Sequence, residues 1–386
     1  MLDIIFLILA FLLLHTYVIF PLTLPIIAEI FRYKPTKKNP VTELPTVSLL
    51  ISAFNEESVI EKKIHNSLAL DYPPEKLQIL IGNDGSTDRT AEIVSKYAPQ
   101  VTLINAPQNQ GKAAMLNQLQ EAATGEILIF CDANTMFFPN VVRKLSHAFS
   151  DEKMGCVCGH LILSDFSGSA LGQGESTYWE FESEVKKFQG QTGAVMGGNG
   201  AIYAIRKSLY SVLPSKKSVM DDFFITIKVL LKGYKSTFIS SAIGTEQTSK
   251  IGTGEYVRKV RIGRANFNYL YAYLPLLNPL RPLVAYYFLS HKLLRWFSPQ
   301  MAIALFVTNF FLWTQNPIYA LLFIVQIIFY SSAFIGLFVA KINKKLNFLS
   351  TPFYFLTMNF ALLKGFFLSF LPEKSGGWVR VSRGDE

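Results

Sequence analysis

The stretch from Leu77 to Asp88 reads LQILIGNDGSTD, an apolar run that ends abruptly in small polar residues. Two other stretches have the same form, because Val47–Ala53 leads into Phe54-Asn55-Glu56-Glu57 and Ile127–Cys131 leads into Asp132-Ala133-Asn134. A shorter run covers 101–104, and segments with helical spacing at 56–70 and 87–97 separate the runs, with Thr87-Asp88 expected to cap the second helix. Strands that alternate with helices predict an α/β fold with a doubly wound parallel sheet.

The polar clusters all fall where the predicted strands end. Asn, Asp and Gly are common turn formers, so any one cluster can be a simple turn. Three of them at successive strand ends indicate a binding site, since ligands of such sheets bind at the carboxyl ends of the strands. Asp132 and Asn134 can supply oxygen ligands to a divalent cation such as Mg²⁺ or Mn²⁺. Lys112, at a predicted helix start, suits a phosphate; a solvated surface lysine is the alternative.

Half of the 386 residues are apolar, and the mean hydropathy of +0.27 predicts a membrane component. The segment 4–28 carries no charged side chain and exceeds the roughly 20 helical residues that cross a bilayer. The segment 301–340 is also free of charge, and Thr314-Gln315-Asn316-Pro317 should divide it into two helices. A third segment, 346–371, is interrupted by Pro352 and Lys364, so it either spans the membrane or lies in its interface.

Positive charge follows the first two apolar segments and is expected on the cytoplasmic side. The residues concerned are Arg32, Lys34, Lys37, Lys38, Lys341, Lys344 and Lys345. The net charge is +9, and without a nucleic-acid-binding motif it favours anionic lipids and diphosphates over nucleic acid as partners. The three cysteines suit a reducing compartment, with Cys156 and Cys158 expected on one face of a buried strand.

These clusters, with Gly111-Lys112-Ala113, Gly198-Asn199-Gly200-Ala201-Ile202-Tyr203 and Met220-Asp221-Asp222, resemble the family 2 glycosyltransferases. The resemblance covers residues 47–265 and implies a GT-A-type mixed sheet, a nucleotide-sugar donor and an inverting, metal-dependent transfer. The membrane segments are similar to those of the cellulose-, chitin- and hyaluronan-synthase-like branch. The implied organisation is a transmembrane helix (1–31), a cytoplasmic catalytic domain (42–265), an interfacial segment (266–296), C-terminal transmembrane helices (297–372) and a tail (373–386).

The resemblance also implies roles for individual residues. Asp222 stands where the family has its general base, and Asp221 precedes it in the catalytic pair. Asp132 and Asn134 stand at the metal motif, with an amide replacing the usual second carboxylate. The donor-binding residues are Asn55, Glu57, Asp84 (as the carboxylate that reads uridine), Lys112, Asp132, Arg258 and Arg261. The acceptor region comprises Gly198, Asn199, Gly200 and Trp179, with Tyr178 and Glu182 on the same amphipathic helix.

One motif departs from the family pattern. Processive members have Gln-x-x-Arg-Trp where this chain has Arg258-Lys259-Val260-Arg261-Ile262, so the arginine is kept and the aromatic platform is lost. This favours single transfers to a surface-glycan or lipid-linked acceptor over a processive synthase that secretes its polymer. Either kind of enzyme can form oligomers or bind export partners. The alternative that is not an enzyme is a non-catalytic membrane scaffold or nucleotide sensor on the same fold.

Overall fold

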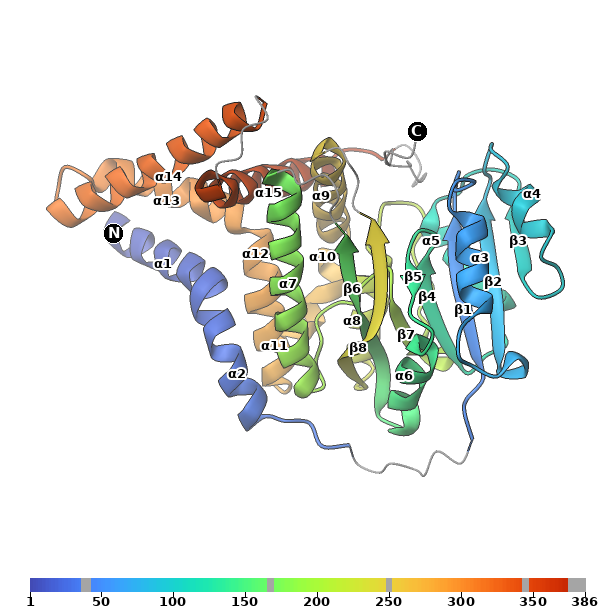
Figure 1. Cartoon of the computed structure of the whole chain (residues 1–386). Helices are drawn as coiled ribbons and strands as arrows, with labels where there is room; N and C mark the ends of the chain where they lie inside the picture. The colour runs from blue at the N-terminus through green and yellow to red at the C-terminus, as the bar shows by residue number, and fades with distance from the viewer. Residues whose placement is uncertain (36–42, 165–169, 248–251, 342–346, 374–386) are drawn as a thin grey trace.

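The computed structural model describes residues 1–35, 43–164, 170–247, 252–341 and 347–373. Its centre is an eight-stranded sheet in the order β3-β2-β1-β4-β7-β6-β8-β5 (Figure 1). The strands are β1 Val47–Ala53, β2 Leu77–Asp84, β3 Thr102–Ala106, β4 Ile127–Asp132, β5 Met136–Phe137, β6 Met154–Ser164, β7 Tyr203–Arg206 and β8 Lys235–Gln247.

The predicted apolar runs form the parallel half of this sheet. β1 pairs in parallel with β2 and β4, and β2 pairs in parallel with β3. The second half is mixed, because β7 runs antiparallel to both β4 and β6. Strand–helix alternation alone predicted a parallel sheet, so that expectation is wrong for the second half, and the mixed sheet implied by the family resemblance is confirmed.

Helices cover both faces of the sheet. The helices of this region are α3 Ile60–Leu68, α4 Thr90–Ser95, α5 Lys112–Ala122, α6 Val141–His147, α7 Ala170–Gln191 and α8 Asp221–Leu231. Alternate β1 residues point to opposite faces, so Leu49 packs in the core with Ile60 of α3 and Leu50 packs in the core with Met115 of α5. β1, β2 and β4 run parallel, so their carboxyl ends meet along one edge.

The helix predicted to start at Thr87-Asp88 begins later. α4 starts at Thr90, because the Asp88 carboxylate accepts hydrogen bonds from the Thr90 backbone N–H at 3.0 Å and from its hydroxyl at 2.6 Å. Asp88 therefore shapes the loop ahead of the helix.

The apolar helices lie beyond the β8 side of the sheet (Figure 1). α1 (Leu2–Leu14), a π-helical turn (His15–Ile19) and α2 (Phe20–Ile30) form one continuous apolar helix. α13 (Ser298–Leu312) and α14 (Pro317–Lys341) are separated where the Thr314–Pro317 break was predicted. By length and composition, Leu2–Ile30 and Pro317–Gly336 can each cross a membrane, while Ser298–Leu312 is shorter.

The last apolar segment is one helix, α15 (Asn347–Ser369), which continues through Pro352 and Lys364. A proline inside a helix removes one backbone hydrogen bond, a loss that packing against neighbouring helices can offset. α15 packs along α9 (Gly252–Asn268) at a close crossing of two glycines, since a Cβ added to Gly263 would lie 3.4 Å from the Gly365 Cα.

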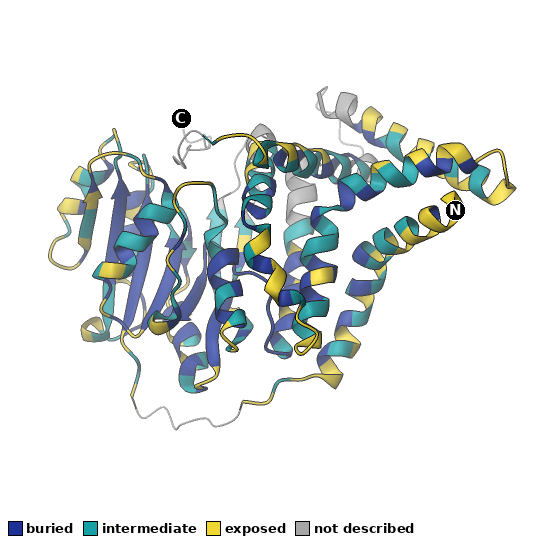
Figure 2. Ribbon diagram, turned by 180° about the vertical axis from the view of Figure 1, so that it is seen from behind, coloured by how far each residue is buried: buried dark blue, intermediate teal, exposed yellow. Residues whose placement is uncertain are grey.

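A chain of short helices joins α9 to α13: α10 Leu270–Tyr273, α11 Pro282–Tyr287, a π-helical turn Phe288–Leu293 and α12 Leu294–Trp296. Tyr273, Phe288 and Trp296 from this chain are buried in the same core as Phe20 of α2. Buried residues consequently run from the sheet into the helices without a break (Figure 2).

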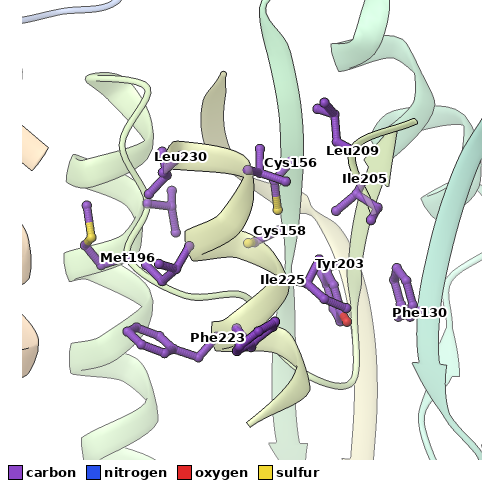
Figure 3. Close-up of a cluster of buried hydrophobic side chains, with 14 of the residues drawn as sticks. Phe130, Cys156, Cys158, Met196, Tyr203, Ile205, Leu209, Phe223, Ile225 and Leu230 are labelled. Carbon is purple, nitrogen blue, oxygen red and sulfur yellow. The ribbon is translucent and has the colours of Figure 1, made fainter. Parts of the chain in front are cut away.

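Cys156 and Cys158 point to the same side of β6, in the core beside Tyr203 and Phe223 (Figure 3). Both thiols are fully buried and unpaired, which confirms the prediction of one buried face.

Candidate active site

The loops after β1 and β2 are joined by their own polar side chains. The Asn55 side-chain oxygen accepts a hydrogen bond from the Thr87 N–H at 2.8 Å, and Asn55 adopts a positive φ of 54°. A Glu57 carboxylate oxygen accepts from the Arg89 N–H at 3.1 Å. Both predicted donor-binding residues therefore lie at the expected sheet edge, where their side chains fix the shape of the loops.

Asp84 ends β2 and is fully buried. Its two carboxylate oxygens accept from the backbone N–H groups of Gln110 at 2.8 Å and Gly111 at 2.9 Å. Burial raises the pKa of Asp84, and these two hydrogen bonds partly oppose the rise. Asp84 thus anchors the loop ahead of α5, in which Gly111 has a φ of 92° that disfavours any side chain.

Lys112, at the first turn of α5, joins two carboxylates from different elements. Its ammonium lies 2.7 Å from an oxygen of Asp132, at the end of β4, and 3.5 Å from an oxygen of Asp221, at the start of α8. Burial alone would lower the pKa of Lys112, but the two carboxylates raise it above its ordinary value. The lysine is therefore a charged group of the site, and the alternative of a solvated surface lysine is wrong.

Asp222 is the next residue along α8. Burial, followed by the like charge of Asp221, raises its pKa to about 6, while the Lys186 ammonium acts in the opposite direction. A carboxylate with this pKa can accept a proton near neutral pH, as a general base must.

The Gly198–Gly200 segment lies directly against Asp222. A Cβ added to Gly198 would come within 3.3 Å of the Asp222 Cβ, and one added to Gly200 within 3.7 Å of its carboxyl carbon. Asn199 donates to the Gly159 carbonyl at 2.7 Å, and its side-chain oxygen accepts from Lys186. The predicted acceptor segment and the predicted base are thus neighbours.

The two arginines of α9 that were predicted to bind the donor have different surroundings. The Arg258 guanidinium lies 5.8 Å from the ring centroid of Trp179, on α7. Part of the Arg261 side chain is exposed to solvent, but protein atoms surround its guanidinium. This desolvation, followed by the charge of Arg258, lowers the pKa of Arg261, while Asp221 and Asp132 act to raise it. Its guanidinium therefore lies within electrostatic reach of the Lys112 carboxylates, whereas Arg258 lies beside the acceptor region.

Two buried lysines of the site were not predicted. Lys186 donates to the Gly198 carbonyl at 3.0 Å, and Lys63 of α3 donates to the Thr135 carbonyl at 2.6 Å behind the loop that holds Asp132 and Asn134. Neither has a sequence signal, because a lysine on an amphipathic helix ordinarily faces water.

Residues 48–213 match the model of the glycosyl transferase family 2. The chain is 27% identical over 291 residues to the probable glycosyltransferase YdaM of Bacillus subtilis, covering 72% of this chain and 69% of that protein. It is 34% identical over 147 residues to the poly-beta-1,6-N-acetyl-D-glucosamine synthase of Staphylococcus aureus, covering 37% of this chain and 35% of the synthase.

Among solved structures, the mannosyltransferase PcManGT from Pyrobaculum calidifontis has the same fold. It superposes with a TM-score of 0.69 over 97% of this chain and 100% of that chain, at 20% identity. The mixed sheet is that of a GT-A fold. Residues 48–213 form a family 2 glycosyltransferase domain, and the protein is a glycosyltransferase enzyme.

Proposed function

We propose that the protein transfers a hexose or N-acetylhexosamine, with inversion, from a UDP-sugar to a surface-glycan or lipid-linked acceptor. The observation that carries this proposal is the convergence of Lys112, Asp132 and Asp221 beside the raised-pKa carboxyl of Asp222. The arrangement offers cationic and metal-binding groups for a diphosphate next to a base for a hydroxyl.

A divalent cation, Mg²⁺ or Mn²⁺, fits at Asp132 and Asn134. The Lys112 ammonium lies between two carboxylates there, so the charge of the pocket suits a cation. In the described part of the chain no three His, Cys, Asp or Glu side chains are grouped to hold a metal, so the donor diphosphate would complete the ligand set. When bound, the cation would supply positive charge to the leaving diphosphate. PcManGT, which shares the fold, was solved with GDP-Man and Mn²⁺.

The residues then divide the reaction between them. An acceptor hydroxyl oxygen forms a bond to the anomeric carbon as the bond from that carbon to the diphosphate oxygen breaks. Asp222 takes the hydroxyl proton. The positive charges of Lys112 and Arg261 stabilise the nucleoside diphosphate as it leaves.

The donor is tested with the full-length protein in detergent. UDP-glucose, UDP-N-acetylglucosamine, UDP-galactose and GDP-mannose are compared by the nucleoside diphosphate released, with Mn²⁺, Mg²⁺ or EDTA. We expect metal-dependent release of UDP from one UDP-sugar. Release that persists in EDTA would exclude the metal, and binding of none of the four donors would overturn the donor class.

Processive synthesis is the second candidate, and the similarity to a poly-beta-1,6-N-acetyl-D-glucosamine synthase favours it. Ile262 in place of an aromatic platform favours single transfers. The product formed on a defined short acceptor distinguishes them, because single transfer adds one sugar and a processive enzyme yields long chains while most acceptor remains unused.

The catalytic domain is proposed to face the cytoplasm, since Arg32 and Lys34 follow the N-terminal apolar helix. Ser215 is exposed, and the three native cysteines are all buried. In a Ser215→Cys variant, a membrane-impermeant maleimide should label spheroplasts only after permeabilisation. Labelling of intact spheroplasts would reverse the orientation.

A further inference from the structure

A group of basic side chains lies beside the acceptor region, where α7 meets the π-helical turn and α12. Lys292 and Arg295 pair with one buried carboxylate, Glu182, and the Lys186 ammonium acts electrostatically on Lys292. Arg295 is the nearer ion-pair partner of Glu182, and the Lys292 ammonium is 3.7 Å from it. We name Lys186, Lys292, Arg295 and Trp179 the basic site.

The basic site has more positive than negative charge. His291 adds none, because burial, followed by the charge of Lys292, lowers its pKa to about 3 despite its 3.2 Å contact with Glu182. Lys292 has a pKa lowered to about 8, chiefly by burial and further by Lys186 and Arg295, so it is still mostly charged at neutral pH. Glu182 and the more distant Asp222 are the acids that act on Lys292, and both act to raise its pKa. The three cations Lys186, Lys292 and Arg295 exceed the two acids Glu182 and Asp222 by one charge, so one bound anion would balance the charge of the site.

A second observation also indicates an anionic ligand. The indole nitrogen of Trp179 is buried and has no hydrogen-bond acceptor within the described residues. An indole nitrogen can only donate, and a buried donor without an acceptor is costly. The Lys186 ammonium is 6.0 Å and the Arg258 guanidinium 5.8 Å from the centroid of the same ring. An oxyanion at this point would accept from the indole while facing both cations.

The surroundings indicate that the anion belongs to a lipid. The Tyr178 ring lies 6.2 Å from the ring of Tyr354, on the apolar helix α15. The same helix exposes Phe360 and Phe367, and the Arg295 guanidinium lies 5.4 Å from the Tyr178 ring centroid, so apolar surface adjoins the cationic groups. A phosphorylated lipid has both features, a charged head and an apolar tail.

We infer that the basic site binds the phosphate of a lipid-linked acceptor and so sets the acceptor class of this enzyme. The inference rests on the proposed function, because it assigns the acceptor of the same reaction. Lys186 donates to the Gly198 carbonyl at 3.0 Å, and Gly198 packs against Asp222, so a phosphate held beside Lys186 places the attached sugar near the proposed base.

The experiment uses the full-length protein in nanodiscs. Binding of a prenyl-diphosphate-linked N-acetylglucosamine is compared with that of the same prenol linked directly to the sugar, and with phosphatidylglycerol added to the disc. The variants are Lys292→Gln, which removes one cation, and Trp179→Phe, which removes the donor and keeps an aromatic ring. Lys187→Gln is the matched control, because Lys187 is exposed on the same helix and pairs with Glu184.

We expect at least tenfold weaker binding of the phosphorylated lipid by Lys292→Gln and a smaller loss by Trp179→Phe, with Lys187→Gln like the wild type. The phosphate-free lipid should bind weakly to all four proteins. Equal binding of the two lipids, or equal loss in all three variants, would overturn the inference, as would displacement by phosphatidylglycerol at comparable concentration. Nucleotide-sugar binding is measured in parallel. If the wild type binds no nucleotide sugar, the result contradicts the proposed function and not the assignment of the basic site.

Discussion

Asp222 and Asp221 are adjacent acids that the structure places in different surroundings. Asp221 faces Lys112 at 3.5 Å, whereas Asp222 is packed against Gly198 and Gly200 and has its pKa raised to about 6. Neighbouring acids whose surroundings differ in this way can take different roles. Asp221 suits the charge balance of the donor site, and Asp222 suits proton transfer.

Replacing Asp222 by Asn should reduce kcat by roughly 10²–10⁴-fold while the Kd for the donor changes little, because the amide cannot take the acceptor proton. Radiolabelled transfer measures kcat, and calorimetry measures donor binding. Asp71→Asn is a surface control, since Asp71 is exposed and pairs with exposed Arg143. A wild-type rate in Asp222→Asn at saturating donor and metal would show that Asp222 is not the base.

The pH dependence follows from the direction of the same pKa shift. Asp222 must be deprotonated to act, so kcat/KM should fall by about tenfold per pH unit below pH 6 and level off above it. Asp221→Asn removes the like charge, so the fall in kcat/KM should begin at a lower pH in this variant. If kcat/KM begins to fall at the same pH in Asp221→Asn and in the wild type, the two acids are not coupled.

At the scale of elements, α3 supports from behind the loop of Asp132 and Asn134, which we propose to bind the metal. Lys63 is fully buried, donates to the Thr135 carbonyl at 2.6 Å and lies 4.4 Å from the Phe137 ring centroid. Lys63→Met keeps the apolar stem and removes the lysine donor from that carbonyl, at a cost of about 1–3 kcal/mol in unfolding free energy. We expect weaker Mn²⁺-dependent donor binding, measured by calorimetry.

Lys62→Met is the control for that change, because Lys62 is exposed on the same helix. Equal donor affinity in Lys63→Met and Lys62→Met would show that α3 does not support the loop. Thermal unfolding of both proteins separates a loss of stability from a loss of donor affinity.

The crossing of α9 and α15 is set by two glycines. A Cβ on Gly365 would lie 2.6 Å from the Val260 carbonyl oxygen, so Gly365→Ala must push the helices apart, at a cost of about 1–3 kcal/mol. The change should lower Tm and also kcat, because α9 holds Arg261. Ser369→Ala, on the same helix, should behave like the wild type, and an unchanged Tm in Gly365→Ala would contradict the close crossing.

At the scale of the molecule, the N-terminal helix is part of the folded core as well as a candidate membrane span. Phe20 is 2% exposed and stacks on His291 at 5.9 Å, whereas Phe11 on the same helix is 56% exposed. Phe20→Ala should cost about 3–5 kcal/mol, and Phe11→Ala should have little effect on the thermal unfolding of the detergent-solubilised protein. Equal Tm values in the two variants would show that the N-terminal helix does not stabilise the folded core.

The sequence by itself determined the parallel strands, the strand-end polar clusters and the apolar segments. These are local features, because an apolar run, a turn residue and an absence of charge are each read over a few neighbours. It also placed Asp84 and Asp132 at the ends of strands, and the family motifs assigned the general base to Asp222. Only the tertiary structure decided which groups meet.

The pairing of Lys112 with Asp132 and Asp221, the buried Lys63 and Lys186, and the basic site around Glu182 join residues from separate elements. Their energies depend on burial and on distances that sequence spacing does not fix. The close crossing of Gly263 and Gly365 is decided in the same way, by side-chain volume where two distant helices touch.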